Sequence, residues 1–363
     1  MSYLSCYCSA LARAQRPSVR LLYFSDALKP QVLWLRRQAK PEVQCTFATS
    51  GQRSAVFQLR FESAVSSEGV SAMRHAMTID VEDYYQVSAM EASVARDQWE
   101  KMESRVVRNT QKILALFAEH NVQATFFVLG WVAERNPALV REIVAQKHEL
   151  ASHGYSHRLV YNQTPEVFRE ETLRGKALLE DITGVPVRGY RAASYSITPR
   201  SSWALDTLIE AGFEYDSSIF PVRHDRYGMP GTPQAPYQLI RPNGGKIVEF
   251  PLSAAHLLGY RLPAAGGGYF RLYPYWLTRL LLTSIERWQR IPFIFYLHPW
   301  EVDPDQPRIP AGKLSTFRHY NNLDVCEERL RRLLKDFSFT TVDAVLRQQG
   351  FWGANQVPEA VIA

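Results

Sequence analysis

Strand-like apolar segments alternate with amphipathic helical segments over most of this chain, and this alternation limits the folds open to it. Apolar stretches with strand composition occur at 76–81 (AMTIDV), 123–129 (QATFFVL) and 293–298 (FIFYLH). Segments 109–121 and 137–148 carry apolar residues at intervals of three and four, which is the period of an amphipathic helix. Strands that alternate with such helices predict an α/β fold with a mainly parallel sheet or barrel.

Three other stretches complete the pattern. Residues 221–275 are rich in Pro, Gly and Tyr, a loop composition with little period of its own. Residues 326–337 predict a charged amphipathic helix, and residues 339–342 predict a strand after it. Residues 1–72 show no sustained period and end in a small, polar stretch, so we expect a poorly ordered N-terminal extension, and translation starting near Met73 is an open alternative.

The net charge of +6 lies almost entirely in this extension. Residues 1–72 contain 9 Lys and Arg against 4 Asp and Glu, which leaves 33 against 32 for residues 73–363. Because phosphate recognition needs a concentrated basic surface on the folded domain, the near-neutral body predicts no nucleic-acid partner.

The apolar runs and the positions of the cysteines indicate the cellular compartment in which the chain is expected. No stretch is long and apolar enough to span a bilayer, and the N-terminus lacks the pattern of a secretory signal, so we expect no transmembrane segment and favour the cytoplasmic side. Three of the four cysteines lie in the extension, and this distribution implies no disulfide framework. The cysteines are Cys6, Cys8, Cys45 and Cys326.

An acidic cluster follows the first strong strand. The segment TIDVEDYYQV (78–87) places Asp80, Glu82 and Asp83 at the end of an apolar run. In parallel α/β folds the carboxyl ends of strands are where active sites form, and carboxylates there are costly to bury without a partner. Taken alone, the cluster is equally compatible with a helix cap followed by a solvated acidic turn.

A histidine pair favours the catalytic alternative. SHGYSH (152–157) holds His153 and His157 four residues apart, so both rings can face one cation from a helical turn or a tight loop. Two histidines and one carboxylate leave coordination positions open for water and substrate, as a catalytic metal requires.

Three further residues are candidates for catalytic or supporting roles. Arg191, in RGYRAAS (188–194), can pair with a catalytic carboxylate, and the small residues after it allow close backbone contact. His298 ends an apolar strand and can act as a general acid, because the pKa of histidine lies near working pH. Asp216, in EYDSSIFP (214–221), can orient a catalytic Arg or His or can cap a turn. Each of the three is also compatible with a structural role.

These pieces, in this order and at these separations, resemble the polysaccharide deacetylase family, also called the NodB-homology or carbohydrate esterase family 4 proteins. The likeness covers roughly residues 76–300. It implies a distorted (β/α) barrel with mainly parallel strands. It also implies a division of the chain into the extension 1–72, a deacetylase core 73–224, a C-terminal part 225–345 that completes the barrel and substrate groove, and a tail 346–363.

The resemblance implies a divalent metal, for which we expect Zn²⁺ with Co²⁺ or Mn²⁺ as alternatives, held by the two histidines and one acid. The family's first motif has two adjacent aspartates, whereas here Val81 separates Asp80 from Glu82 and Asp83. We favour Glu82 as the ligand because it shares a strand face with Asp80, while Asp83 turns inward only if the strand ends there. RAAS also stands where relatives have an arginine followed by two prolines.

The roles that the resemblance implies complete the expected site. The metal and a backbone N–H from the stretch 193–195 would stabilise an oxyanion, and several aromatic side chains are candidates for stacking on sugar rings. Asp80 would be the general base and His298 the general acid, Arg191 would keep Asp80 ionised, and Asp216 would support Arg191 or His298. The stacking candidates are Tyr84, Tyr85, Tyr269, Phe270 and Trp300.

The resemblance thus implies hydrolysis of N-acetyl groups from an N-acetylhexosamine polymer. VEDYYQV, GGGYFR (266–271) and FYLHPWE look like the subgroup found with exosortase and exopolysaccharide biosynthesis clusters. Two alternatives remain open: hydrolysis of a small amide or ureide, and a carbohydrate-binding homologue that has lost catalysis.

Overall fold

A computed structural model describes residues 73–224, 227–257, 260–353 and 357–362, together with the backbone of five strands nearer the N-terminus. The chain divides into two units, Met1–Ser71 and Ala72–Ala363. Of the helices described, none is both long enough and apolar enough to cross a bilayer.

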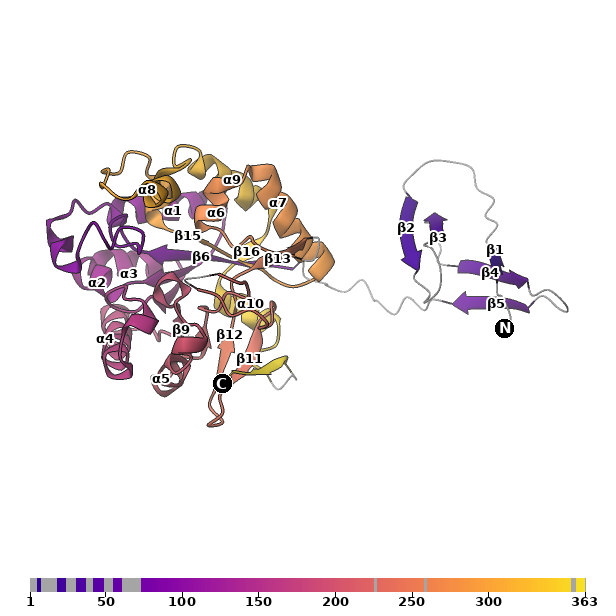
Figure 1. The fold of residues 1–363 in the computed structure, drawn as a ribbon, viewed down its shortest axis with the longest axis horizontal. Helices are drawn as coiled ribbons and strands as arrows, with labels where there is room; N and C mark the ends of the chain where they lie inside the picture. The colour runs from indigo at the N-terminus through magenta and orange to yellow at the C-terminus, as the bar shows by residue number, and fades with distance from the viewer. Residues whose placement is uncertain are drawn as a thin grey trace. The chain divides into compact units, whose positions relative to one another are not determined.

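The first unit contains short antiparallel strand pairs, in the orders β1-β4-β5 and β2-β3. Its other residues lie outside the described part of the chain, so the poorly ordered extension stays a prediction. The strands are β1 (Ser5–Tyr7), β2 (Ser18–Tyr23), β3 (Gln31–Arg36), β4 (Glu42–Ala48) and β5 (Ala55–Arg60) (Figure 1).

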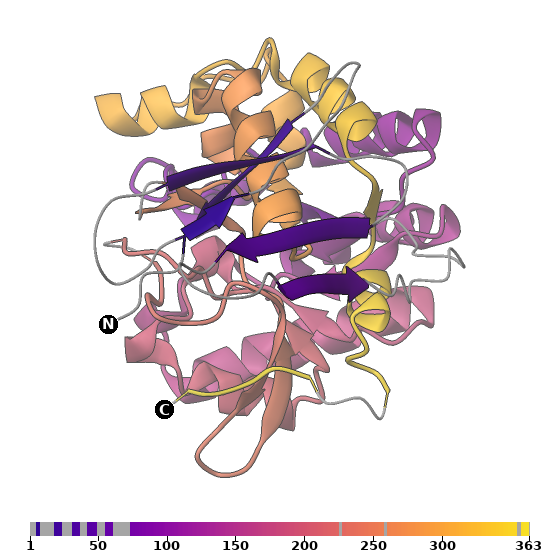
Figure 2. The same cartoon turned by 90° about the vertical axis from the view of Figure 1, so that its right-hand side faces the viewer.

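The second unit is built on one large sheet of order β15-β6-β7-β8-β9-β10-β12-β11-β17, with β16 also paired to β6. Its neighbours are parallel except for the β11–β12 hairpin, which projects at the lower edge of Figures 1 and 2. The mainly parallel α/β sheet is confirmed, but over the described strands it is an open path, so the expected barrel does not close. The strands are β6 (His75–Val81), β7 (Thr125–Val128), β8 (Glu149–Ser152), β9 (Gly189–Tyr190), β10 (Tyr215–Asp216), β11 (Tyr237–Ile240), β12 (Lys246–Glu249), β15 (Ile294–Leu297), β16 (Phe339–Thr340) and β17 (Glu359–Val361).

Helices surround this sheet in the second unit (Figure 2). The helices predicted at 109–121, 137–148 and 326–337 are confirmed as α1, α3 and α9. Pro137 occupies the first turn of α3, and the side chain of Asn136 before it donates to the Val132 carbonyl and does not cap that helix. The helices are α1 (Val106–Glu119), α2 (Gly130–Arg135), α3 (Pro137–Ala145), α4 (Pro165–Thr183), α5 (Ala204–Glu210), α6 (Gly267–Leu272), α7 (Tyr275–Ser284), α8 (Lys313–Tyr320), α9 (Cys326–Asp336) and α10 (Val342–Gln348).

The segment 221–275 is more ordered than its composition predicted. It contains β11, β12, the hairpin β13 (Ala254–Leu257) and β14 (Tyr260–Pro263), and helix α6. Each of these elements is four to six residues long, too short to carry a visible period, and the Pro and Gly between them are turn residues.

Alternate residues of β6 face two different hydrophobic clusters. Met77, Ile79 and Val81 pack in the cluster that contains side chains of most of the helices, whereas Ala76 packs in a second cluster with Phe127 of β7 and side chains of α10. Since side chains alternate along a strand, Asp80 points to the same side as Ala76. Strand geometry therefore directs this carboxylate to the side of the sheet opposite most of the helices.

Candidate active site

Site residues from distant parts of the sequence meet at one edge of the sheet. Asp80 lies near the carboxyl end of β6, His153 directly follows β8, and His298 directly follows β15. Strands β15, β6, β7 and β8 are consecutive and parallel, so these carboxyl ends lie together.

Glu82, His153 and His157 form a compact cluster of metal-ligand side chains. One ligand atom from each lies within 4.8 Å of the others, and all three residues are buried. Nε2 of His157 is 2.8 Å from Oε2 of Glu82, yet that buried oxygen has no hydrogen-bond partner among the described groups. A buried carboxylate oxygen facing imidazole nitrogens without hydrogen-bond geometry fits a cation between them.

The electrostatics of the cluster also suit a cation. Burial lowers the pKa of His153 to about 4, which keeps its imidazole neutral, as metal ligation requires. Burial acts to raise the pKa of Glu82, but the neighbouring His157 and His298 outweigh it and lower that pKa to about 2. The carboxylate is therefore ionised at any working pH.

The histidine pair lies in a tight loop after β8, one of the two geometries expected from its spacing. Gly154 and His157 both have positive φ, +74° and 52°, which turns the chain back on itself. Nδ1 of His153 lies 2.8 Å from the Arg191 carbonyl oxygen, so this ring can donate there and leave Nε2 for a ligand.

Asp83 lies apart from the cluster, which corrects one of the two predicted alternatives for the acid ligand. Its Oδ2 accepts from Ser104 Oγ at 2.8 Å and from the backbone N–H groups of Arg105 at 2.8 Å and Val106 at 3.1 Å, at the start of α1. Its Oδ1 accepts from the Tyr84 N–H at 3.0 Å. Burial nevertheless raises its pKa to about 6. Asp83 caps a helix because β6 ends at Val81 and the chain turns before it.

Asp80 and Arg191 form a fully buried ion pair, as the sequence predicted. The guanidinium Nη1 donates to Asp80 Oδ1 at 2.6 Å and to Thr78 Oγ1 at 2.8 Å. Ser217 holds the rest of the guanidinium through its carbonyl and hydroxyl oxygens, at 3.2 and 3.0 Å. Burial opposes the charge of Arg191, but Asp80 outweighs it and raises the arginine pKa. The pair fixes the position of one Asp80 oxygen and leaves the other toward the cavity.

His298 faces both carboxylates of the site. Its Nε2 lies 3.4 Å from Glu82 Oε1 and 4.0 Å from Asp80 Oδ2. Its Nδ1 lies 2.6 Å from Glu301 Oε1, and Glu301 Oε2 in turn accepts from Arg271 Nε at 2.6 Å. Burial acts to lower the pKa of His298, but Glu301 and Glu82 outweigh it and raise that pKa to about 9. The ring is therefore a proton donor at neutral pH.

Glu301 and Arg271 are functional candidates that the sequence analysis missed. Glu301 is completely buried, and it also accepts from the backbone N–H of His298, in a capping box that starts the short helix Pro299–Val302. The signal was present in the sequence as His-Pro-x-Glu, with Pro at the first helical position and Glu at the third. Arg271 ends GGGYFR, where nothing local indicated a buried ion pair.

Asp216 was expected to support Arg191 or His298. Among the described residues, it forms no hydrogen bond or ion pair with either of them. It lies on β10, and its Oδ1 accepts from Ser218 Oγ at 2.6 Å. Ser218 Oγ accepts from the Ala192 N–H at 2.8 Å, so Asp216 supports the backbone after Arg191 only at one remove. Burial raises its pKa to about 6. The place expected for it beside His298 is held by Glu301.

The stretch 193–195 lies at the cavity in an uncommon conformation. Ser194 and Tyr195 are both left-handed, with φ of 49° and 55°, and both line the cavity. The Tyr195 N–H donates to the Ala192 carbonyl at 3.1 Å, so that amide is already used. An oxyanion donor from this stretch stays a prediction for the amides of Ala193 and Ser194.

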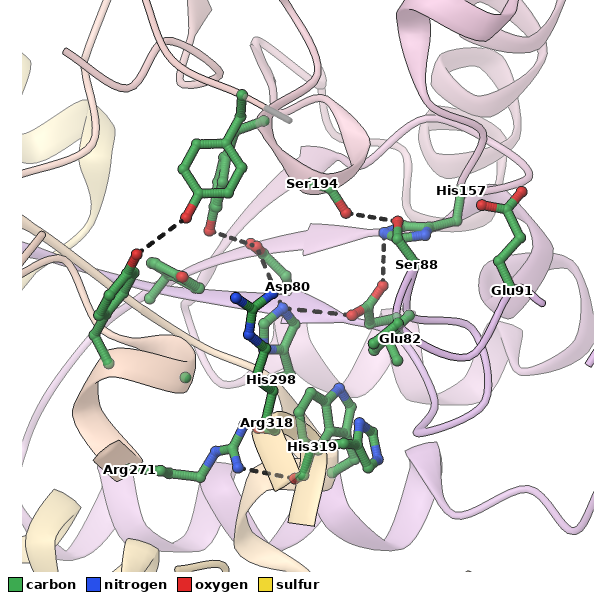
Figure 3. Close-up of a pocket in the computed structure, with 18 of the residues that line it drawn as sticks. Asp80, Glu82, Ser88, Glu91, His157, Ser194, Arg271, His298, Arg318 and His319 are labelled. Carbon is green, nitrogen blue, oxygen red and sulfur yellow. Dashed lines mark hydrogen bonds and ion pairs between the residues drawn. The ribbon is translucent and has the colours of Figure 1, made fainter. Parts of the chain in front are cut away.

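A cavity of about 560 Å³ lies over these side chains. Figure 3 shows Glu82 between His157 and His298, with Asp80 beside His298. Tyr269 and Trp300, two of the stacking candidates, line the cavity, whereas Tyr84, Tyr85 and Phe270 are buried in hydrophobic clusters.

This arrangement, a buried Glu–His–His cluster with Asp80 and His298 beside it in an α/β fold, has the groups that a hydrolase site needs. Residues 97–215 match the family described as Polysaccharide deacetylase. These residues, about a third of the chain, therefore form a polysaccharide deacetylase domain. Residues 217–347 match a second family, described as Domain of unknown function (DUF3473).

Curated relatives match over short segments. A peptidoglycan-N-acetylglucosamine deacetylase of Bacillus cereus is 32% identical over 71 residues, 20% of this chain and 33% of that protein. A peptidoglycan deacetylase of Helicobacter pylori is 31% identical over 108 residues, 30% of this chain and 36% of that protein. The chain therefore spans about a third of the length of these two relatives.

The fold is shared with a solved structure. A Mycobacterium smegmatis protein assigned to the polysaccharide deacetylases superimposes with a TM-score of 0.51 at 20% identity, over 78% of this chain and 92% of that one. The superposition extends beyond residues 97–215, because 78% of the chain is more than those residues provide.

Proposed function

We propose that this chain hydrolyses N-acetyl groups from N-acetylhexosamine residues of a polysaccharide, with a divalent metal as cofactor. The observation that carries the proposal is the Glu82–His153–His157 cluster with Asp80 and His298 next to it. The two named relatives, described as a peptidoglycan-N-acetylglucosamine deacetylase and a peptidoglycan deacetylase, support the same chemistry.

Zn²⁺ is the proposed ion. Two imidazoles and one carboxylate are its usual catalytic ligand set and leave a position open. When bound there, the ion would polarise the acetamido carbonyl and lower the pKa of a water molecule.

The side chains of this chain account for the proton transfers. Asp80 accepts a proton from the attacking water, whose oxygen bonds to the amide carbon, and Arg191 holds Asp80 in place through their ion pair. His298 donates a proton to the amide nitrogen as the C–N bond breaks, giving acetate and a free amine. Glu301 holds the His298 ring in place through Nδ1. A backbone amide at the carbonyl oxygen would contribute roughly 3–4 kcal/mol to transition-state stabilisation.

A role in exopolysaccharide biosynthesis is part of the proposal and rests on the resemblance of three motifs to that subgroup. The size of the cavity and the aromatic side chains along it favour an oligosaccharide over a small amide or ureide.

The test combines metal content with acetate release. The purified chain is stripped with a chelator, reloaded with Zn²⁺, Co²⁺ or Mn²⁺, and assayed on N-acetylglucosamine oligosaccharides. His153→Ala is expected to lose both bound metal and activity. Asp80→Asn is expected to keep the metal and to lower kcat by roughly 10²–10⁴-fold. His120→Ala, at the end of α1, is the matched histidine control and should behave as the parent.

Full activity in His153→Ala or Asp80→Asn would contradict the proposal. Hydrolysis of small amides alone would favour the ureide-type alternative. Absence of any bound divalent ion after reloading would favour a non-catalytic carbohydrate-binding protein.

A further inference from the structure

The cavity is lined by five Asp, Glu and Arg side chains, and four of them have a partner of opposite charge. The exception is Arg318. Within the part of the chain that the structure describes, no carboxylate forms an ion pair with its guanidinium. The four pairs are Asp80 with Arg191 at 2.6 Å, Glu82 with the protonated His298 at 3.4 Å, Glu91 with Arg96 at 2.8 Å, and Arg271 with Glu301 at 2.6 Å.

Arg318 reaches this cavity from α8. Its side chain is solvent-exposed and is among the cavity residues drawn in Figure 3. Its backbone carbonyl accepts from Arg271 Nη2 at 3.0 Å, so the buried Arg271–Glu301 pair anchors the point from which the guanidinium extends. The cation is thus held near the cavity without a carboxylate partner among the described residues.

Two tyrosine hydroxyls lie on the same part of the wall. Oη of Tyr227 is 3.4 Å from Oη of Tyr269, and both side chains line the cavity. Burial raises the pKa of Tyr227, and the positive charge of Arg318 opposes that rise slightly, so the guanidinium lies within electrostatic reach of this phenol. Because one tyrosine hydroxyl donates to the other, the guanidinium and one free O–H provide for one anionic group with two oxygens.

We propose that Arg318, with Tyr227 and Tyr269, binds the carboxylate of an acidic sugar next to the N-acetyl sugar, so that the substrate is an anionic glycan. This inference rests on the proposed function, because it names the substrate of that same site. One unpaired cation matches one negative charge, and the planar guanidinium matches the two oxygens of a carboxylate. A neutral glycan would offer the guanidinium no counter-charge.

The test compares two oligosaccharides that differ only in this charge. One alternates N-acetylglucosamine with glucuronic acid, and the other is its carboxyl-reduced counterpart. kcat/KM for acetate release is measured for the metal-loaded chain, for Arg318→Gln and for Arg318→Lys. Lys313→Gln removes a cation from the same helix at a position that does not line the cavity, and it controls for general charge effects.

The parent is expected to prefer the acidic substrate by about tenfold or more, chiefly through KM, and salt should weaken the preference. Arg318→Gln is expected to bring the ratio near one, Arg318→Lys to give an intermediate ratio, and Lys313→Gln to keep the parent ratio. A parent without preference, or an Arg318→Gln variant that keeps it, would overturn the inference.

Failure of the proposed function has a different signature, namely no acetate from either oligosaccharide. In that case calorimetric Kd values for the same two compounds decide about Arg318. Tighter binding of the acidic compound that is lost in Arg318→Gln supports the carboxylate subsite, and equal Kd values overturn it.

Discussion

The two halves of the catalytic unit contribute to one site in different ways. Residues 73–216 supply the metal-ligand cluster and the base with its arginine, and these side chains are all buried at the ends of parallel strands. Residues 217–347 supply His298, which is partly accessible, and the exposed Arg318. The segment of unknown function therefore contributes side chains to the candidate active site.

The difference concerns which positions are fixed by the sheet. In the first half, strand register and buried ion pairs hold each group, so there is little room for variation. In the second half, short helices and loops present the acid and the cavity wall, and loops on a rigid scaffold are where specificity commonly resides. We expect substitutions in the first half to abolish chemistry or folding, and those at the rim of the second half to change substrate choice.

The largest predicted effect is that of Glu301→Gln, which breaks a buried ion pair inside the second half. It tests whether substitutions in that half change only substrate choice. Loss of a partner that orients a catalytic histidine is expected to lower kcat by about 10–100-fold. Leaving Arg271 buried without its counter-charge should also cost roughly 3 kcal/mol of folding free energy. Acetate release and chemical denaturation measure the two effects.

Asp216→Asn is the comparison for Glu301→Gln, because sequence reasoning gave Asp216 the role that Glu301 occupies. It should lower kcat less than Glu301→Gln does. The reverse order would restore Asp216 as the partner of the catalytic acid.

A smaller effect separates the two adjacent acids of the first half. Asp83→Ala removes the acceptor for the first N–H groups of α1 and should cost about 2–3 kcal/mol of stability. Bound metal should be retained after reloading, whereas Glu82→Gln should lose it. Metal analysis and urea denaturation test both statements, and loss of metal in Asp83→Ala alone would reverse the assignment.

The smallest predicted effect lies at the opposite end of β6, away from the site. Burial lowers the pKa of His75 to about 4, and its Nδ1 accepts the Phe293 N–H at 3.2 Å, which requires an unprotonated nitrogen. The unfolded chain binds a proton at this residue near pH 6.5, so the stability that His75 supports is present above that pH and is lost as pH falls toward 4. Relative to His75→Asn, the parent should lose about 2 kcal/mol between pH 7.5 and pH 5. A stability difference that stays constant with pH would contradict this.

Much of the fold was accessible from the sequence because the long elements have clear periods. Strands β6, β7 and β15 and helices α1, α3 and α9 were predicted at or near their observed bounds. The four-residue strands between 237 and 263 were not, since a short strand within Pro- and Gly-rich sequence has no measurable period. Whether the sheet closes into a barrel depends on pairing between its edges, which no local pattern encodes.

For the site, the sequence by itself determined which residue types stand at strand ends: Asp80, the histidine pair and His298. Tertiary structure alone decided how they are partnered. It brought Glu82 to the histidines and Asp83 to a helix end, because the chain turns immediately after β6. It also joined Arg271 to Glu301, 30 residues away, through a buried pair. The sequence determines which side chains stand at the end of a strand, but only tertiary packing determines which distant charged residue pairs with them.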